Sequence, residues 1–130
     1  MVKELTNKEK DAIKKTRGRK GENLASDYLR KQGYKVIERN FRCKAGEIDL
    51  IGVKERTISF VEVKARTRTD YGMPREAVNR KKQRRLLMAA QLYLKIHPVF
   101  SAYNCSMDII EILYTNDGTY IRHNVNAFSI

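Results

Sequence analysis

The sequence predicts a single α/β domain over residues 1–130, with a mixed sheet of about five strands flanked by helices. The length is typical of one domain, and no internal repeat, low-complexity tract or linker rich in Pro, Gly or Ser divides the chain. Segments with a helical spacing of apolar residues alternate with segments rich in β-branched residues, in the order α-β-β-β-α-β-β. An apolar content of 42% excludes wholesale disorder.

Two helices are expected. In residues 21–31 apolar side chains recur at i and i+4, and Gly33 follows as the terminating residue. The second helix is longer and spans residues 75–96. Pro74 suits the first position of a helix, and His97-Pro98 closes the segment.

The strands are expected in segments with alternating or β-branched residues, namely 34–38, 47–53, 57–65, 105–114 and 119–124. Only the polar Lys54-Glu55-Arg56 separates the second segment from the third, so these two are predicted to form a hairpin. Asn116-Asp117-Gly118 predicts a turn between the last two strands.

The positive charge of the chain is concentrated in two segments. Lys and Arg number 27 against 15 Asp and Glu, which gives a net charge of +12 and a pI of about 9.9. Residues 1–20 have a net charge of +5 and residues 64–85 of +7, while the rest of the chain is close to neutral. A surplus of this kind favours a polyanionic partner, with nucleic acid first and an anionic membrane surface second. The alternative is that each run is a solvated helix face; residues 1–16 are expected to be a flexible or helical basic extension.

The sequence does not favour a membrane or secreted protein. Its longest nearly uncharged apolar stretch, residues 86–94, is about half the length of a membrane span. The N-terminus has no apolar region of the kind found in signal peptides. Cys43 and Cys105 are too few for a disulfide framework or a four-cysteine zinc site. We therefore expect a cytoplasmic protein with reduced thiols.

Two carboxylates are predicted to face each other in the hairpin. A four-residue connection would pair Val53 with Ile58, and counting back places Asp49 opposite Glu62. Like charges on such an apolar strand face are destabilising unless a cation lies between them. Lys64 is two residues beyond Glu62 and points the same way. A slip of one residue in the register would separate the pair.

A fourth candidate comes from the first helix. Glu22 precedes apolar residues at i+3 and i+7, which places this carboxylate on the packed face. Mg²⁺ takes a few carboxylates and keeps several waters, and such an ion polarises a phosphoryl oxygen and activates water. Asp49, Glu62 and Lys64 therefore match the needs of metal-dependent phosphodiester cleavage. The alternative is ion pairing of Lys64 with Asp49 or Glu62 at a strand end, with no ligand.

These residues resemble a known motif. Asp49, twelve intervening residues and Glu62-Val63-Lys64 are similar to the PD-(D/E)xK motif of restriction-endonuclease-like nucleases, with Ile48 where the motif's name has Pro. The wider pattern, over about residues 15–125, resembles the YraN-like family of small bacterial proteins in that superfamily, near archaeal Holliday-junction resolvases. That pattern consists of Gly21-Glu22 with Ala25 and Tyr28-Leu29, then Gly46-Glu47-Ile48-Asp49-Leu50-Ile51, then Phe60-Val61-Glu62-Val63-Lys64.

The resemblance implies a restriction-endonuclease-like fold and a role for each residue of the motif. Asp49 and Glu62 would be ligands of Mg²⁺ or Mn²⁺, with the Val63 carbonyl as a third. Lys64 would orient or activate the attacking water, and Glu22 would complete the acidic cluster directly or through water. By analogy with the resolvases alone, a homodimer would suit a junction-cleaving enzyme.

A basic segment follows the motif directly. Its members are expected to contact backbone phosphates of a nucleic acid, and they are Arg66, Arg68, Arg75, Arg80, Lys81, Lys82, Arg84 and Arg85. Lys82 lies at i+4 from Val78 on the packed side, so it either snorkels or reaches the metal site or the scissile phosphate. No groove-reading or base-stacking motif stands out, which predicts binding by shape or structure with a steep dependence on salt.

The leading hypothesis is a Mg²⁺-dependent nuclease-like domain that acts on DNA, with branched or damaged DNA as candidate substrates. The second hypothesis is a non-catalytic nucleic-acid-binding module that retains the fold and needs no metal. A third, weaker hypothesis is an assembly protein that docks an acidic partner or a membrane. In the later strand, Asp108 is expected to be a partner for a basic residue, with catalysis as the less favoured role, and His97 and His123 are expected to be structural.

Overall fold

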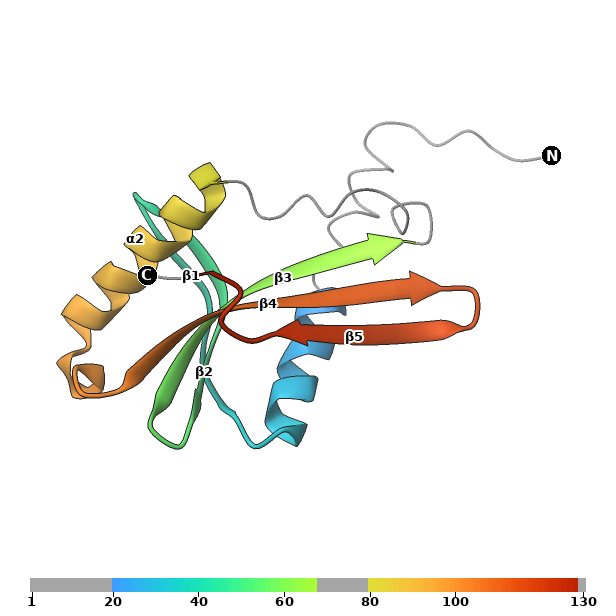
Figure 1. Cartoon of the computed structure of the whole chain (residues 1–130), viewed down its shortest axis with the longest axis horizontal. Helices are drawn as coiled ribbons and strands as arrows, with labels where there is room; N and C mark the ends of the chain where they lie inside the picture. The colour runs from blue at the N-terminus through green and yellow to red at the C-terminus, as the bar shows by residue number, and fades with distance from the viewer. Residues whose placement is uncertain (1–19, 68–79, 129–130) are drawn as a thin grey trace.

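A computed structural model describes residues 20–67 and 80–128 of the chain (Figure 1). A first helix covers residues 20–31. The elements that follow it are β1 (Lys35–Cys43), β2 (Gly46–Lys54), β3 (Thr57–Thr67), α2 (Arg80–Ile96), the short 3-10 helix η2 (Pro98–Phe100), β4 (Asn104–Thr115) and β5 (Gly118–Asn124). This confirms the predicted α/β class and the order α-β-β-β-α-β-β.

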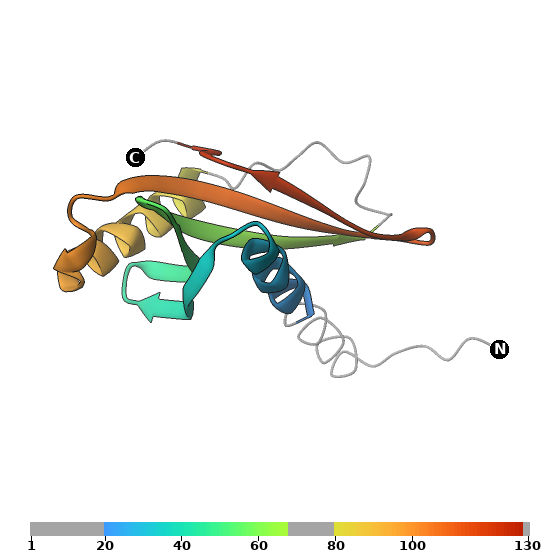
Figure 2. The same cartoon turned by 90° about the horizontal axis from the view of Figure 1, so that it is seen from below.

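The five strands form one mixed sheet in the order β1-β2-β3-β4-β5. Neighbouring strands are antiparallel except for β3 and β4, which run parallel. A parallel pair requires a crossover connection, and α2 lies in the segment that joins β3 to β4. Figures 1 and 2 show that β3, β4 and β5 extend well beyond the end of α2.

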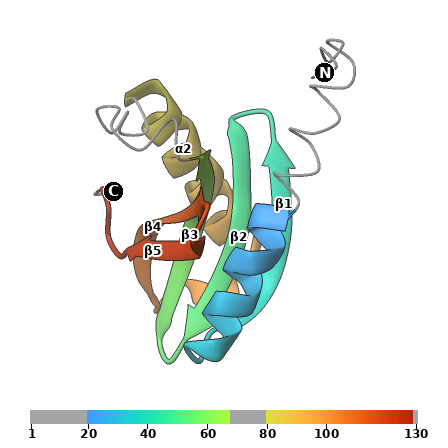
Figure 3. The same ribbon diagram turned by 90° about the vertical axis from the view of Figure 1, so that its right-hand side faces the viewer.

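The two helices cover opposite faces of the sheet (Figure 3). Four buried residues of α2, namely Leu86, Ala89, Ala90 and Tyr93, form a stripe with helical spacing. This stripe packs on a core that includes Phe60 of β3, whereas Leu29 of the first helix packs on a core that includes Val61. Successive residues of a strand point to opposite faces, so β3 is buried on both sides at its centre.

The register of the β2–β3 hairpin agrees with the prediction, because Val53 pairs with Ile58. The ladder runs from the pair Lys54–Thr57 to the pair Leu50–Val61 and stops there. Asp49 and Glu62 are the next residues along each strand, so they lie where β2 parts from β3. The predicted register is therefore correct, but the two acids are not a ladder pair.

Strand β1 extends to Cys43, five residues beyond the predicted end at Glu38. The added segment contains Arg39, Asn40 and Arg42, whose polar character does not indicate a strand. It is a strand because it pairs with the apolar half of β2, where Phe41 is opposite Ile48. The predicted start of the second helix, residues 75–79, and the basic extension at 1–16 lie outside the described residues. In the described part of the chain, no helix is long and apolar enough to cross a membrane.

Candidate functional site

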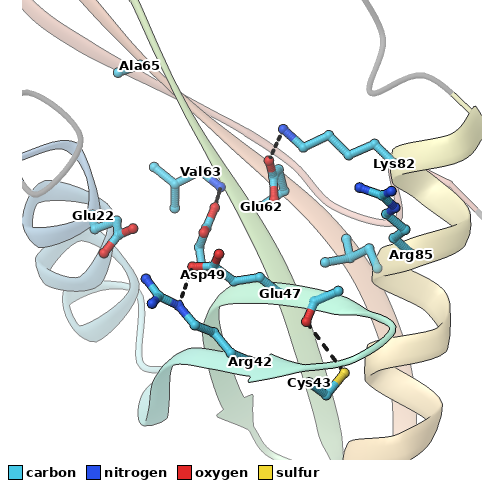
Figure 4. A pocket seen from close by; sticks show the side chains of 12 residues that line it. Glu22, Arg42, Cys43, Glu47, Asp49, Glu62, Val63, Ala65, Lys82 and Arg85 are labelled. Carbon is cyan, nitrogen blue, oxygen red and sulfur yellow. Dashed lines mark hydrogen bonds and ion pairs between the residues drawn. The ribbon is translucent and has the colours of Figure 1, made fainter. Parts of the chain in front are cut away.

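A cavity of about 590 Å³ lies where β2 parts from β3, between the first helix, the β1–β2 hairpin and the N-terminal half of α2 (Figure 4). Its acidic lining residues are Glu22, Glu47, Asp49 and Glu62. Its basic lining residues are Arg42, Lys82 and Arg85. Glu22, Asp49 and Glu62, which are far apart in the sequence, thus line one cavity.

Asp49 is held against β3 by a backbone hydrogen bond. The Val63 N–H donates to Asp49 Oδ2 at 2.8 Å, across the point where the β2–β3 ladder has ended (Figure 4). The side chain of Asp49 thereby provides the contact between the two strands that their backbones no longer make. This bond fixes the carboxylate in the cavity.

The environment of Asp49 favours its neutral form. Burial of the carboxyl, followed by the negative charge of Glu62, raises its pKa from 3.8 to about 7. The charges of Glu22 and Glu47 add to the rise, and the hydrogen bond from Val63 opposes it. A cation placed beside Asp49 would favour its charged form and oppose this rise in pKa.

Glu62 already has a cation beside it. Its side chain is largely buried, and Lys82 Nζ of α2 lies 2.7 Å from its Oε1 (Figure 4). The sequence left open whether Lys82 snorkels or reaches the site, and the structure places its ammonium on Glu62. The Lys82 side chain is half-exposed.

Lys64, the lysine of the motif, is not among the residues that line the cavity. It shares a strand face with Glu62 and lies opposite Glu111 of β4 in the parallel register. The side chain is half-buried. The amine that the structure places on Glu62 is that of Lys82, and the water-orienting role that the resemblance implies for Lys64 remains a prediction.

Glu22 lines the same cavity but is drawn towards β1. Asn40 Nδ2 donates to Glu22 Oε2 at 3.2 Å, and the Arg39 guanidinium lies 4.0 Å from the same oxygen. Asn40 has a φ of 54°, a left-handed conformation that Asn adopts more readily than most residues. Sequence reasoning missed both partners, because no pattern in an isolated Arg-Asn pair indicates what it contacts.

The donor set fits a hard divalent cation with two protein carboxylates. Among residues 20–67 and 80–128, no group of three or more His, Cys, Asp or Glu side chains is arranged to hold a metal ion. Mg²⁺ is commonly held by one or two carboxylates and keeps several waters, so Asp49 and Glu62, which line one cavity, are the residues that would hold such an ion. Because Glu22 is engaged by Asn40, it would act through water rather than as a direct ligand.

The predicted phosphate-binding residues differ in their availability. Arg66 is largely buried, and its Nε lies 3.7 Å from Glu111 Oε2, so its guanidinium is engaged within the sheet. The basic residues exposed on α2 are Arg80, Lys81, Lys82, Arg84 and Arg85. Two of these, Lys82 and Arg85, also reach the cavity. Arg68 and Arg75 lie outside the described residues.

Asp108 lies apart from the cavity, in a buried polar network. Its carboxylate accepts a hydrogen bond from Ser106, and its Oδ2 lies 2.7 Å from His123 Nε2. The other ring nitrogen of His123 lies 3.1 Å from the hydroxyl of Tyr28 on the first helix. The network joins β4, β5 and the first helix, so Asp108 has the basic partner that was expected and its place is structural.

Comparison with known proteins identifies the family. Residues 21–112 match the model of "Uncharacterised protein family UPF0102". A UPF0102 protein of Caldanaerobacter subterraneus subsp. tengcongensis is 45% identical over 123 residues, which cover 92% of this chain and 99% of the relative. A UPF0102 protein of Syntrophomonas wolfei is 48% identical over 108 residues, covering 83% and 93%, and one of Geobacter metallireducens is 44% identical over 117 residues, covering 89% and 94%. The chain therefore belongs to the UPF0102, or YraN-like, family of the restriction-endonuclease-like superfamily.

Proposed function

We propose that this protein binds nucleic acid and is a metal-dependent endonuclease that hydrolyses phosphodiester bonds in DNA, with branched or damaged DNA as candidate substrates. The observation that carries the proposal is the pair of carboxylates, Asp49 and Glu62, that share one cavity. Burial raises the pKa of Asp49 and the negative charge of Glu62 raises it further, so a cation bound beside the two acids would stabilise their charged forms.

Asp49 and Glu62, with the Val63 carbonyl, would hold Mg²⁺ or Mn²⁺, and Glu22 would contribute through water. A bound ion of this kind supplies Lewis acidity to a phosphoryl oxygen and lowers the pKa of a water molecule. The chain itself contributes positive charge at the rim. Lys82 and Arg85 line the cavity from α2, where they would hold the phosphate that is to be cleaved.

The remaining basic residues of α2 would position the DNA backbone. Arg80, Lys81 and Arg84 are exposed on the same turns of α2 as the two cavity residues. Contacts of this kind fix the register of a nucleic acid without reading its sequence. They support a protein that recognises the shape of its substrate.

The test is a cleavage screen with linear duplex, nicked, single-stranded and branched DNA, and with RNA, in Mg²⁺ or Mn²⁺. We expect cleavage of at least one DNA form by the wild-type protein, and none by Asp49→Asn or Glu62→Gln. Asp27→Asn is the matched control, because Asp27 is exposed on the first helix and makes only a 3.9 Å surface pair with Arg30. Wild-type protein that cleaves none of these substrates would contradict the proposal.

A non-catalytic nucleic-acid-binding module is the second candidate, and the Lys82–Glu62 ion pair is the observation that favours it. This contact gives Glu62 a counter-charge from within the chain, so the fold does not depend on a metal ion for that purpose. Such a module would bind DNA with equal affinity in the presence of EDTA and of Mg²⁺, and would cleave no DNA form. Negligible DNA binding at about 50 mM salt would contradict both candidates.

A further inference from the structure

One face of strands β3, β4 and β5 continues outward from the cavity. The register places nine residues in three rows across these strands: Glu62, Ile109 and Asn124; Lys64, Glu111 and Arg122; and Arg66, Leu113 and Tyr120. We call these nine residues the open sheet face. The first row starts at Glu62, and each later row lies two residues further along the strands.

Side-chain contacts show that these residues point to the same side of the sheet. Glu111 is contacted from both neighbouring strands, by Arg66 of β3 at 3.7 Å and by Asn124 of β5 at 3.5 Å. The ion pair of Glu62 with Lys82 identifies this side as that of α2. The intervening residues Ile110 and Ile112 point the other way and pack with the first helix.

In the described part of the chain, this face is less covered than the opposite one. Ile110 and Ile112 are fully buried, whereas Ile109, Glu111 and Leu113 are only partly buried. The three strands also run past the end of α2 in Figures 1 and 2. At the outer end of the face, Tyr120 is 55% exposed.

The exposed groups on this face suit a nucleic-acid strand. Including Lys82 at its inner edge, the face has four cationic side chains and two carboxylates. Lys82 is paired with Glu62 and Arg66 with Glu111, so the exposed cation at the outer end of the face is Arg122. Arg122 is exposed and Tyr120 is an exposed aromatic residue beside it. An exposed cation beside an exposed aromatic side chain is a combination that binds a single strand, because a phosphate contacts the cation and an unstacked base covers the ring.

The dimensions of the open sheet face also suit a short stretch of a nucleic-acid strand. Tyr120 is two strands and four residues away from the position of Glu62, which corresponds to roughly 16 Å for strands about 4.8 Å apart with about 3.3 Å per residue. A stacked nucleic-acid strand advances by about 3.4 Å per nucleotide, so this separation corresponds to roughly five nucleotides.

We propose that the open sheet face holds an unpaired DNA strand that leads to the cavity, with Arg122 on a backbone phosphate and Tyr120 stacked on a base. The proposal rests on the proposed function, and it names the substrate class as DNA with a single-stranded arm. A duplex keeps its bases stacked on each other, so it can use Arg122 but has no free base for Tyr120.

The test measures binding without cleavage, in EDTA, by fluorescence anisotropy of a single-stranded oligonucleotide and of the matching duplex over a range of salt. Tyr120→Leu should weaken single-strand binding about tenfold and leave duplex binding unchanged, and Tyr120→Phe should bind like the wild type. Arg122→Gln should weaken binding severalfold and lower the salt slope by about one. The matched control is Lys31→Gln, since Lys31 is exposed on the first helix, which covers the other face.

The results separate this proposal from the proposed function. If wild-type protein binds the single strand but cleaves no DNA, the nuclease proposal fails. The Tyr120 and Arg122 variants then still test whether the open sheet face binds an unpaired strand. If Tyr120→Leu loses as much affinity for the duplex as for the single strand, or if neither variant differs from Lys31→Gln, the open sheet face does not bind an unpaired strand. If the variants instead change the molecular mass in solution without changing DNA binding, this face contacts a second copy of the chain and the proposal is overturned. Melting temperatures close to that of the wild type, expected for exposed positions, show that the variants are folded.

Discussion

Lys82 Nζ lies 2.7 Å from Glu62 Oε1, so the first turns of α2 supply the counter-charge for a largely buried carboxylate of β3. The same carboxylate is half of the pair that would hold a metal ion. If Asp49 and Glu62 hold a divalent cation as proposed, Lys82 and that cation would compete for Glu62. An ammonium displaced by the metal would then be available to a phosphate.

Lys82→Met should tighten the binding of Mn²⁺ to the free protein. Without the half-exposed ion pair, the free energy of Mn²⁺ binding should be more favourable by about 1 kcal/mol. This corresponds to about a fivefold lower dissociation constant. Calorimetric titration with Mn²⁺ measures this value. Lys81→Met is the control, because Lys81 is exposed on α2 and does not line the cavity. Equal metal affinity in wild type and Lys82→Met would show that the ammonium does not compete.

The protonation of Asp49 should make stability depend on pH. Its pKa is about 7 in the folded protein and 3.8 ordinarily, so between these values the folded state holds a proton that the unfolded state has lost. The free energy of unfolding should therefore fall as pH rises from about 4 to 7, by at most about 4 kcal/mol from this group, and then level off. Asp49→Asn should be more stable than the wild type at pH 8 and differ little from it at pH 4. Denaturant unfolding at the two pH values measures the difference, and an equal effect of the substitution at both would contradict the assignment.

The same proton should compete with the metal. Below pH 7 the affinity for Mn²⁺ should fall by up to about tenfold per pH unit, because Asp49 must lose its proton to become a ligand. Titration at pH 6 and pH 8 measures this dependence. An affinity that does not change with pH would exclude Asp49 as a ligand.

Much of the fold could be predicted from the sequence, because its signals are local. Strand β2 and the paired strand β3 alternate or are β-branched, and the short polar link at residues 54–56 sets their register, so Val53 is opposite Ile58 as expected. Strand β1 was predicted too short, because Arg39 to Cys43 become a strand through pairing with β2 rather than through their own propensity.

The candidate site was only partly predictable, for a related reason. Asp49 and Glu62 could be placed together because one hairpin holds both. The partners of the site, Asn40 on Glu22 and Lys82 on Glu62, come from elements whose approach depends on tertiary packing. Periodicity showed only that Lys82 lies on the packed side of its helix. Its contact with Glu62 depends on how α2 crosses the sheet.

Gly46 sets the distance between the β1–β2 hairpin and α2. A methyl group at this position would lie 2.9 Å from the backbone oxygen of Arg85, a contact that backbone atoms cannot relieve without movement. Gly46→Ala should therefore push α2 outward, with a loss of about 1–3 kcal/mol in the free energy of unfolding and a weaker approach of Lys82 and Arg85 to the cavity. Denaturant unfolding measures the loss, with Lys44→Ala in the adjoining turn as the control. If Gly46→Ala has the same free energy of unfolding as the wild type, the β1–β2 hairpin and α2 are not in tight contact.

Asp108→Ala separates stability from function. Asp108 is fully buried and accepts contacts from Ser106, His123 and the Asn126 N–H. Removing the carboxylate leaves these groups without their partner inside the protein, which should cost about 3 kcal/mol of the free energy of unfolding. Because the network lies outside the cavity, the folded fraction should bind DNA and Mn²⁺ like the wild type. Denaturant unfolding and titrations at a temperature where the variant is folded measure the two properties. A variant of wild-type stability that has lost metal binding would move Asp108 from the structural network into the site.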